Sequence, residues 1–373
     1  MNRKSIIPYI LFSWISVLCH AQTGRMFTVE RELSSSMVNS IYQSHDNIVW
    51  IATEDGLNKY DGAKFSIYKN NKNDEHSLAN NYVRFVFESS HKECFVGTLT
   101  GLQHYDADTD SFTDIPLIRQ DGTIVKPNVA TIKELSNGEL LVGTASQGVF
   151  KIESTQQGLI GTSMQSTIPV STINVIHEDT NGNLWISTGE KGIFRMDRNR
   201  QLHCYLKEEN EAEFTISSIC ETPDKQIYIG TLGKGLLKYD PVCDLFEPIT
   251  YTGYPKLPVK SLLLANPDEI YIGTDGCGLK VYNTKSHTFT ENLLNITTFD
   301  LAKSKIHSIM KDSFGNLWLG FFQKGVLLVP AIANGFQYIG YKSEHNNIIG
   351  SNCIMSVCYD NNGTLWVGTD NDG

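Results

Sequence analysis

The sequence predicts an all-β fold, a seven-bladed β-propeller of four-stranded antiparallel blades followed by the first part of an eighth repeat. The first observation is a hairpin motif, seen as LWISTGEKGIF at residues 184–194, that recurs eight times. The second is its period of roughly 43 to 48 residues, which is typical of propeller blades. The third is an aliphatic residue twelve positions before the central residue of every copy. The central residues are Thr53, Thr98, Thr144, Thr188, Thr231, Thr274, Phe321 and Thr369.

Each repeat is expected to contain four strands joined by tight turns. The first strand resembles residues 173–177, and the second resembles residues 184–188. A Gly-Leu-x-x-Tyr segment such as residues 235–239 marks the third strand, and a later Phe such as Phe246 marks the fourth. Asn-Gly at residues 181–182 supplies the positive φ that a turn between the first two strands needs.

Two further positions of the repeat are interpreted as packing positions. Glycines in the second strand are expected to let blades approach closely near the axis, as at Gly97, Gly143 and Gly230. A large aromatic slot recurs in the same strand, and it holds Trp50, Phe95, Trp185, Tyr228, Tyr271, Trp318 and Trp366. Flat strands bury such residues against the next sheet, which favours core packing over a sugar-binding platform.

The first residues are predicted to be an export signal. In residues 1–21, Arg3 and Lys4 precede an apolar run that is too short to span a membrane. The small residues Cys19 and Ala21 then occupy positions suited to cleavage by signal peptidase. We therefore expect a secretory signal peptide and an exported mature chain.

The remaining chain is divided into two parts by the repeat. Residues 22–341 supply seven repeats, enough for one closed ring, and the segment near Met26 resembles an outer strand that completes a late blade. Residues 342–373 form an incomplete eighth repeat that stops before its third strand. Half a blade leaves an apolar face and open strand edges, so we interpret this part as the start of a second propeller.

Charge and cysteine usage exclude several classes of protein. The formal net charge is -10, and a nucleic-acid partner would require clustered Lys and Arg. The seven cysteines after residue 21 have no regular spacing and no C-x-x-C, so neither a disulfide framework nor a zinc site is indicated. H-E-x-x-H, G-x-S-x-G and P-loop motifs are also missing. No cofactor, metal site or catalytic residue is predicted.

The repeat D-x-x-G-x-(L/I)-W-(I/V)-G-T-x-x-G-L-x-x-(Y/F), iterated behind a signal peptide, resembles the two-component regulator propeller repeat. The resemblance implies the periplasmic sensor region of a hybrid two-component sensor histidine kinase of Bacteroidetes. It further implies an oligosaccharide ligand, control of polysaccharide utilisation, and a parent chain anchored in the inner membrane. The implied partners are a downstream propeller, the kinase domains of the parent chain and a second copy in a homodimer.

A ligand is expected on the face where the second strand of each blade turns into the third. Side chains at equivalent offsets near the starts of the first strands are Asn39, Arg84, Asn174 and His307. The loops between second and third strands add Lys191, Lys234, Asp275 and Lys324. Such a mixture of amides, acids and bases suits a polyhydroxylated or anionic sugar, with ordinary solvated turns as the alternative interpretation.

A secreted propeller enzyme, such as a streptogramin-type or polysaccharide lyase, is the competing hypothesis. Lyases on such rings also carry Gly-Asn-Leu-Trp hairpins, and they would require a His and metal-binding acids that converge on one face. The sequence offers only His307 for that role.

Overall fold

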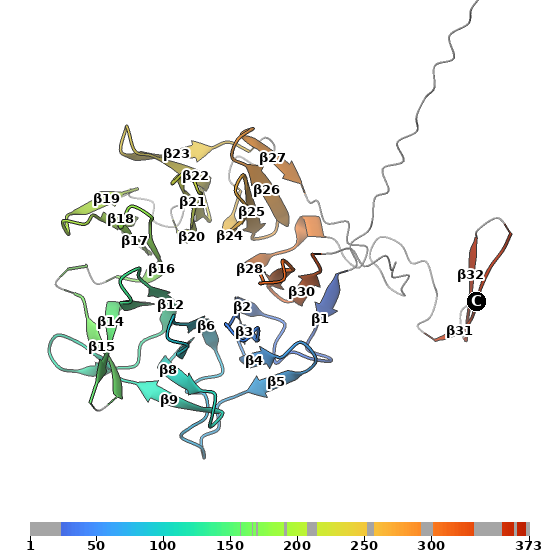
Figure 1. Ribbon diagram of the computed structural model, residues 1–373, viewed down its shortest axis with the longest axis horizontal. Coiled ribbons are helices and arrows are strands. Elements are labelled where there is room, and N and C mark those ends of the chain that lie inside the picture. Colours follow the sequence, from blue (N-terminus) through green and yellow to red (C-terminus); the bar gives the residue numbers. More distant parts are fainter. Residues whose placement is uncertain are drawn as a thin grey trace, which may run out of the picture.

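The computed structural model describes residues 24–156, 158–165, 167–168, 171–189, 192–206, 215–251, 257–291, 301–331, 353–361 and 364–370. Seven blades surround a central axis (Figure 1), and each is built on four antiparallel strands. Apart from the single 3-10 turn η2 (Leu301–Lys303), the described elements are all strands. The prediction of an all-β, seven-bladed propeller is confirmed. The predicted signal peptide, residues 1–21, lies outside the described residues.

The innermost strands surround the axis and the second strands lie directly outside them. The innermost strands are β2 (Val38–Gln43), β6 (Val83–Glu88), β12 (Val129–Glu134), β16 (Ile173–Glu178), β20 (Ile216–Glu221), β24 (Val259–Asn266) and β28 (Ile306–Lys311). The second strands are β3 (Val49–Thr53), β7 (Cys94–Thr98), β13 (Leu140–Thr144), β17 (Leu184–Thr188), β21 (Ile227–Thr231), β25 (Glu269–Thr274) and β29 (Leu317–Phe321).

The third and fourth strands complete each blade toward the outside. The third strands are β4 (Gly56–Tyr60), β8 (Gly101–Asp106), β14 (Gly148–Thr155), β18 (Ile193–Met196), β22 (Gly235–Asp240), β26 (Leu279–Asn283) and β30 (Gly325–Val329). The outer strands are β5 (Phe65–Tyr68), β9 (Ser111–Ile115), β15 (Gly158–Ser163), β19 (Leu202–Tyr205), β23 (Leu245–Ile249), β27 (Thr288–Glu291) and β1 (Arg25–Phe27).

The ring is closed by the first strand of the chain. Strand β1 pairs antiparallel with β30, with Phe27 opposite Val326, and so supplies the outer strand of the seventh blade. In Figure 1 the blue β1 lies beside the orange-red β30. The innermost strands of neighbouring blades contact one another all the way round, including β28 with β2. The predicted closure by an N-terminal strand is confirmed.

Glycines near the axis set how closely the blades approach. A Cβ added at Gly97 would lie 2.5 Å from a methyl carbon of Val129 in the next blade, and one at Gly143 would lie 2.6 Å from Ile173. Gly320 has the same relation to Val38 across the closure, at 2.7 Å. Any side chain at these positions would displace an inner strand, which confirms the packing role predicted for these glycines.

The recurring Asp and Trp of the repeat form one hydrogen-bonded unit. The Asp179 carboxylate accepts hydrogen bonds from the indole of Trp185 at 2.8 Å and from the backbone and side-chain nitrogens of Asn183, both at 2.8 Å. Asp312 and Trp318 repeat the arrangement in blade seven. Trp185 is 1% exposed, so the aromatic slot is core packing, as predicted.

Blade three differs from the expected four strands, because its sheet contains six. Two short strands, β10 (Leu117–Ile118) and β11 (Ile124–Val125), form a hairpin between β9 and β12. Strand β10 runs parallel to the outer strand β15 and pairs with it. A hairpin inserted after the second blade therefore extends the third one.

The eighth repeat contributes a two-stranded hairpin, β31 (Ile354–Tyr359) and β32 (Leu365–Thr369). Its Trp366 is 60% exposed, although the indole donates to Asp360 as in the complete blades. The predicted incomplete eighth repeat is thus seen in its first two strands, while its assignment to a second propeller remains a prediction. Within the described part of the chain, no helix has the length and apolar character needed to span a membrane.

Candidate functional site

Each innermost strand of the ring carries a β-bulge after its first residue. In β2 the pairing with β3 runs from Val38 directly to Ser40, so the residue between them has no partner across the ladder. A bulge leaves one residue unpaired and redirects its side chain. The seven unpaired residues, which we call the bulge ring, are Asn39, Arg84, Ala130, Asn174, Ser217, Lys260 and His307.

The bulge ring brings together four of the predicted ligand-binding residues, one from each of four blades. Asn39, Arg84, Asn174 and His307 all occupy it, and Figure 1 shows their strands around the centre of the ring. It also contains Lys260, which the sequence analysis missed. Lys260 could have been predicted from its position in the repeat. It follows Val259 by one residue, just as Asn39 follows Val38.

The neutral members of the bulge ring bond to the next blade or stay unpartnered. The Asn39 Nδ2 atom donates to the carbonyl oxygen of Val83 at 2.7 Å, and the Ser217 hydroxyl donates to that of Val259 at 2.7 Å. The Nδ2 atom of Asn174 is buried and has no hydrogen-bond partner among the described residues. A donor in that state is a candidate for a bond to a bound molecule.

Two basic side chains, Arg84 and Lys260, belong to the bulge ring. Arg84 is half-buried, and its Nη1 atom donates to the side-chain oxygen of Asn128 at 3.4 Å. Burial lowers the pKa of Lys260, the positive charge of Arg84 lowers it further, and Asp275 opposes both. The positive charge of Arg84 therefore acts on Lys260, although the two residues belong to blades two and six.

His307 is held beside Asp275 and Phe322. Its Nε2 atom lies 3.8 Å from the Asp275 carboxylate, and its ring stacks on Phe322 with 5.2 Å between centroids. Burial, followed by the charges of Lys260 and Lys305, lowers the pKa of His307 to about 4 against the opposing effect of Asp275. The imidazole is therefore neutral at pH 7.

The predicted loop residues have different positions. Asp275 reaches the bulge ring and forms an ion pair with Lys305 at 3.0 Å. Lys324 donates to the Ser304 hydroxyl at 3.4 Å, and the backbone nitrogen of Lys234 donates to Thr231 at 2.9 Å. Lys191 lies outside the described residues. The binding roles of Lys191, Lys234 and Lys324 remain predictions.

The inserted hairpin of blade three builds a polar pocket beside one of the loops between second and third strands. The pocket has a volume of about 430 Å³, and its lining includes Arg119, Ser146, Gln147 and Gln165. The Arg119 Nε atom donates to the side-chain oxygen of Gln147 at 2.9 Å. Amide and guanidinium groups of this kind form directional hydrogen bonds to hydroxyl groups.

The opposite end of the channel has a repeated contact between blades. There the last residue of an inner strand accepts a hydrogen bond from a backbone nitrogen in the turn between the first two strands of the preceding blade. In one case Ser90 donates to Glu134 through its backbone nitrogen at 2.7 Å and its hydroxyl at 2.6 Å. The acceptors of these contacts, which we call latches, are Gln43, Glu88, Glu134, Glu178 and Glu221.

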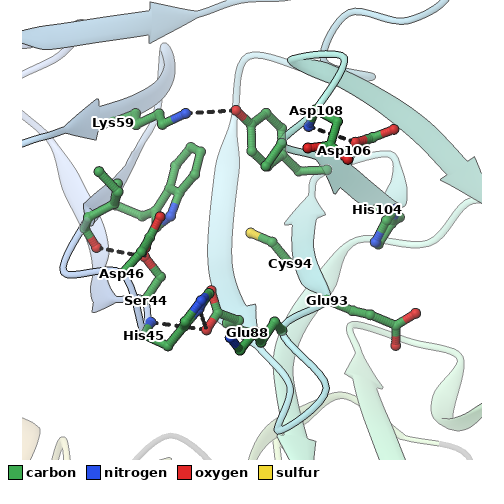
Figure 2. A pocket seen from close by; sticks show the side chains of 15 residues that line it. Ser44, His45, Asp46, Lys59, Glu88, Glu93, Cys94, His104, Asp106 and Asp108 are labelled. Atoms are coloured by element: carbon green, nitrogen blue, oxygen red, sulfur yellow. Dashed lines mark hydrogen bonds and ion pairs between the residues drawn. The ribbon is translucent and has the colours of Figure 1, made fainter.

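The latch between blades one and two borders a pocket of about 330 Å³ (Figure 2). Here His45 takes the place of the Ser or Thr donor, with its Nδ1 atom 2.7 Å from the Glu88 carboxylate. Figure 2 shows His45 and Glu88 facing each other, with His104 and Glu93 apart from them. His45, Asp46 and Glu88 are close enough to hold a metal ion. The latch already explains Glu88, because equivalent acids make the same contact at other blades.

The arrangement of the histidines bears on the lyase hypothesis. His307 belongs to the bulge ring, where its Nε2 atom lies 3.8 Å from the Asp275 carboxylate. The group of His45, Asp46 and Glu88 lies at the other end of the channel. Among the described residues, these two sets do not converge on one face as the hypothesis would require.

Comparison with known proteins defines the repeat. The family described as two component regulator propeller matches residues 32–55, 167–190 and 348–371. An 83-residue segment, 21% of this chain, is 37% identical to histidine kinase P4 of Formosa agariphila and spans 6% of that protein. Three segments of the chain thus match the two-component regulator propeller repeat.

Solved structures of extracellular domains share the fold. The domain of BT3049 from B. thetaiotaomicron, assigned to a hybrid two-component system, is 22% identical, with a TM-score of 0.71. The match covers 94% of this chain and 47% of that domain. The domain of BT4673 from the same organism, also assigned to a hybrid system, is 16% identical, with a TM-score of 0.69 and coverage of 93% and 46%. The chain thus spans about half of each of these domains.

Proposed function

We propose that this chain is part of the periplasmic ligand-sensing region of a hybrid two-component sensor histidine kinase. In this proposal it senses oligosaccharides and thereby regulates polysaccharide utilisation. The bulge ring is the observation that carries the proposal. Seven structurally equivalent positions of a repeated scaffold carry six different residue types, and the side chains include amide, hydroxyl, imidazole and cationic groups.

An oligosaccharide suits this arrangement because it offers many hydroxyl groups spread over several sugar rings. The Asn174 amide and the cations of the bulge ring supply donors at the axis. Arg119 and Gln147 supply further polar groups at the pocket of blade three. Polar groups that converge from different elements fix both the identity and the orientation of a ligand.

Signalling requires a ligand that binds one arrangement of the sensor better than another. We place that difference between this propeller and a downstream one, or between two copies of the parent chain. The kinase domains of the parent would read the change across the inner membrane. The three segments that match the two-component regulator propeller repeat, and the shared fold with extracellular domains of hybrid systems, support this assignment.

Calorimetric titration of the complete sensor region against a panel of neutral and acidic glycan fragments tests the proposal. We expect saturable heat with at least one fragment and loss of that heat in an Asn39→Ala/Asn174→Ala variant. Glu75→Ala, at an exposed position away from the bulge ring, is the control variant. Absence of heat with every fragment would refute oligosaccharide sensing. Cleavage of a fragment during the titration would instead favour the lyase hypothesis.

A further inference from the structure

We propose that the bulge ring seats an anionic group of the ligand, a carboxylate or a sulfate, between Arg84 and Lys260. The inference rests on the proposed oligosaccharide-sensing function and adds to it the chemical class of sugar. It depends on the placement of the two cations, on the charges around them and on the neutral donor beside them.

The placement of the cations follows from the ring. Arg84 is the bulge residue of β6, which contacts β2 and β12, whereas Lys260 is the bulge residue of β24, which contacts β20 and β28. The two strands are therefore not neighbours, and their bulge residues lie on opposite sides of the ring. The positive charge of Arg84 acts on Lys260, which is consistent with side chains that approach from opposite sides.

The charges around the cations leave an excess of positive charge. Asp275 forms an ion pair with Lys305 at 3.0 Å and lies 3.8 Å from the neutral imidazole of His307, and it is also the carboxylate that acts on Lys260. Arg84 bonds to a neutral amide and forms no ion pair with a carboxylate among the described residues. One carboxylate thus faces several basic groups in a protein whose net charge is -10.

Two other acids near this end, both on the loop after β3, are already engaged. Glu54, on the loop after β3, accepts a hydrogen bond from the Tyr82 hydroxyl at 3.1 Å. Asp55 forms an ion pair with Lys69 at 2.6 Å and accepts from Asn81 at 2.9 Å. The excess positive charge at the bulge ring is therefore open to an incoming anion.

The chemistry of the two cations defines the group that they would bind. A guanidinium donates two parallel hydrogen bonds to a carboxylate or a sulfate, and an ammonium adds a point charge. The side-chain amide of Asn174, on the same ring, offers a neutral donor without a partner. Two like charges held close in a half-buried site cost stability unless an anion lies between them.

A uronic acid and a sulfated sugar would present the same chemistry, so the experiment has arms for both. The complete sensor region is titrated with a galacturonate oligosaccharide, its neutral methyl ester, a sulfated disaccharide and its desulfated form. A further arm measures thermal stabilisation by sodium sulfate relative to sodium chloride at equal ionic strength. Wild type is compared with Arg84→Gln, Lys260→Gln, the double variant and the control Lys64→Gln, which changes an exposed lysine on the outer turn of blade one.

We expect at least one acidic sugar to bind, with a tenfold or greater loss of affinity in each single variant and a larger loss in the double variant. Lys64→Gln should bind like wild type, and the excess stabilisation by sulfate should disappear in the double variant. Equal binding of acidic sugars by wild type and a folded double variant would overturn the inference. Binding confined to neutral sugars would overturn it while leaving oligosaccharide sensing intact, and binding of no sugar would refute both.

Discussion

The two ends of the inner strands follow opposite rules, although both are built from the same seven repeats. At the latch end, five of the seven equivalent positions hold Gln or Glu, and all five accept a backbone hydrogen bond from the preceding blade. The other two positions are Leu264 and Lys311. At the bulge end, the equivalent positions hold side chains of six different types. The more uniform latch end stabilises the contacts between blades, and the varied bulge end presents the side chains that we propose for ligand binding.

The interface between blades five and six supports a structural role for the latch, which is to hold one blade against the next. Its donor position is Pro223, which has no N–H group, and its acceptor position is Leu264, which has no carboxylate. Both partners of the latch are therefore missing together, and no donor is left unpaired. Such matched loss is expected of a contact whose role is packing of one blade on the next.

The largest effect is expected from breaking the Asp–Trp unit that shapes the turns at the latch end. Asp179→Ala removes a buried acceptor of several hydrogen bonds and leaves the Trp185 indole unpaired, so it should lower the free energy of unfolding by about 3 kcal/mol. Urea unfolding followed by tryptophan fluorescence measures the change. Asp360→Ala, in the exposed eighth-repeat hairpin, is the matched control and should leave the ring stable. Equal losses in both variants would contradict this reading.

A smaller loss is expected from removing one latch. Glu134→Ala deletes the acceptor for the backbone nitrogen and hydroxyl of Ser90 at an exposed contact, so stability should fall by about 1 kcal/mol. Binding at the bulge end should be unchanged, because the latch lies at the other end of the channel. Chemical denaturation and calorimetry on the same preparation measure the two quantities. A loss of ligand affinity without a loss of stability would reverse the roles that we assign to the two ends.

At the bulge end, a substitution should increase stability instead of lowering it. Lys260→Gln removes a desolvated cation that faces Arg84, so without ligand the free energy of unfolding should rise by roughly 0.5 to 1 kcal/mol. The exposed Lys64→Gln is the control and should change stability by less than about 0.5 kcal/mol. Denaturant titration of both variants measures the difference. Destabilisation by Lys260→Gln would mean that the lysine supports the fold rather than a ligand.

A pH dependence of stability is expected from His307. Its folded pKa, about 4, lies below the ordinary value of 6.5, so the unfolded chain binds the proton more tightly. His307 therefore adds a stability that is fully present above pH 6.5 and is lost as the pH falls toward 4. Melting temperatures at pH 7.5 and pH 4.5 should differ less in His307→Gln than in wild type. The same pH dependence in both proteins would show that His307 is not the group responsible.

Much of the fold followed from the sequence because the signal was repeated. A single LWIST hairpin is ambiguous, but eight copies with fixed internal spacing fix the strand order and the turns between the first two strands. The close approach at Gly97 and Gly143 was also predictable, since a glycine between β-forming residues has few other uses. The six-stranded sheet of blade three was not, because β10 and β11 are two-residue strands with no repeat to align them.

The candidate site was predicted only in part for a related reason. Asn39, Arg84, Asn174 and His307 were selected by their offset, and that offset proved to be a bulge position in every blade. Lys260 has the same offset but was overlooked, and its importance appears only when the ring brings it opposite Arg84. Charge across a channel depends on which blades face each other, and one-dimensional spacing does not contain that information.

By itself, the sequence determined the local unit: a hairpin in which an Asp accepts a hydrogen bond from the Trp indole, as in the exposed eighth copy at Asp360 and Trp366. Short-range hydrogen bonds and turn geometry require only neighbours along the chain. The tertiary structure alone decided which copies bury their Trp, how the N-terminal strand closes the ring, and which bulge residues share one channel. Those outcomes depend on contacts between blades that are far apart in sequence, and the closed ring creates all of them together.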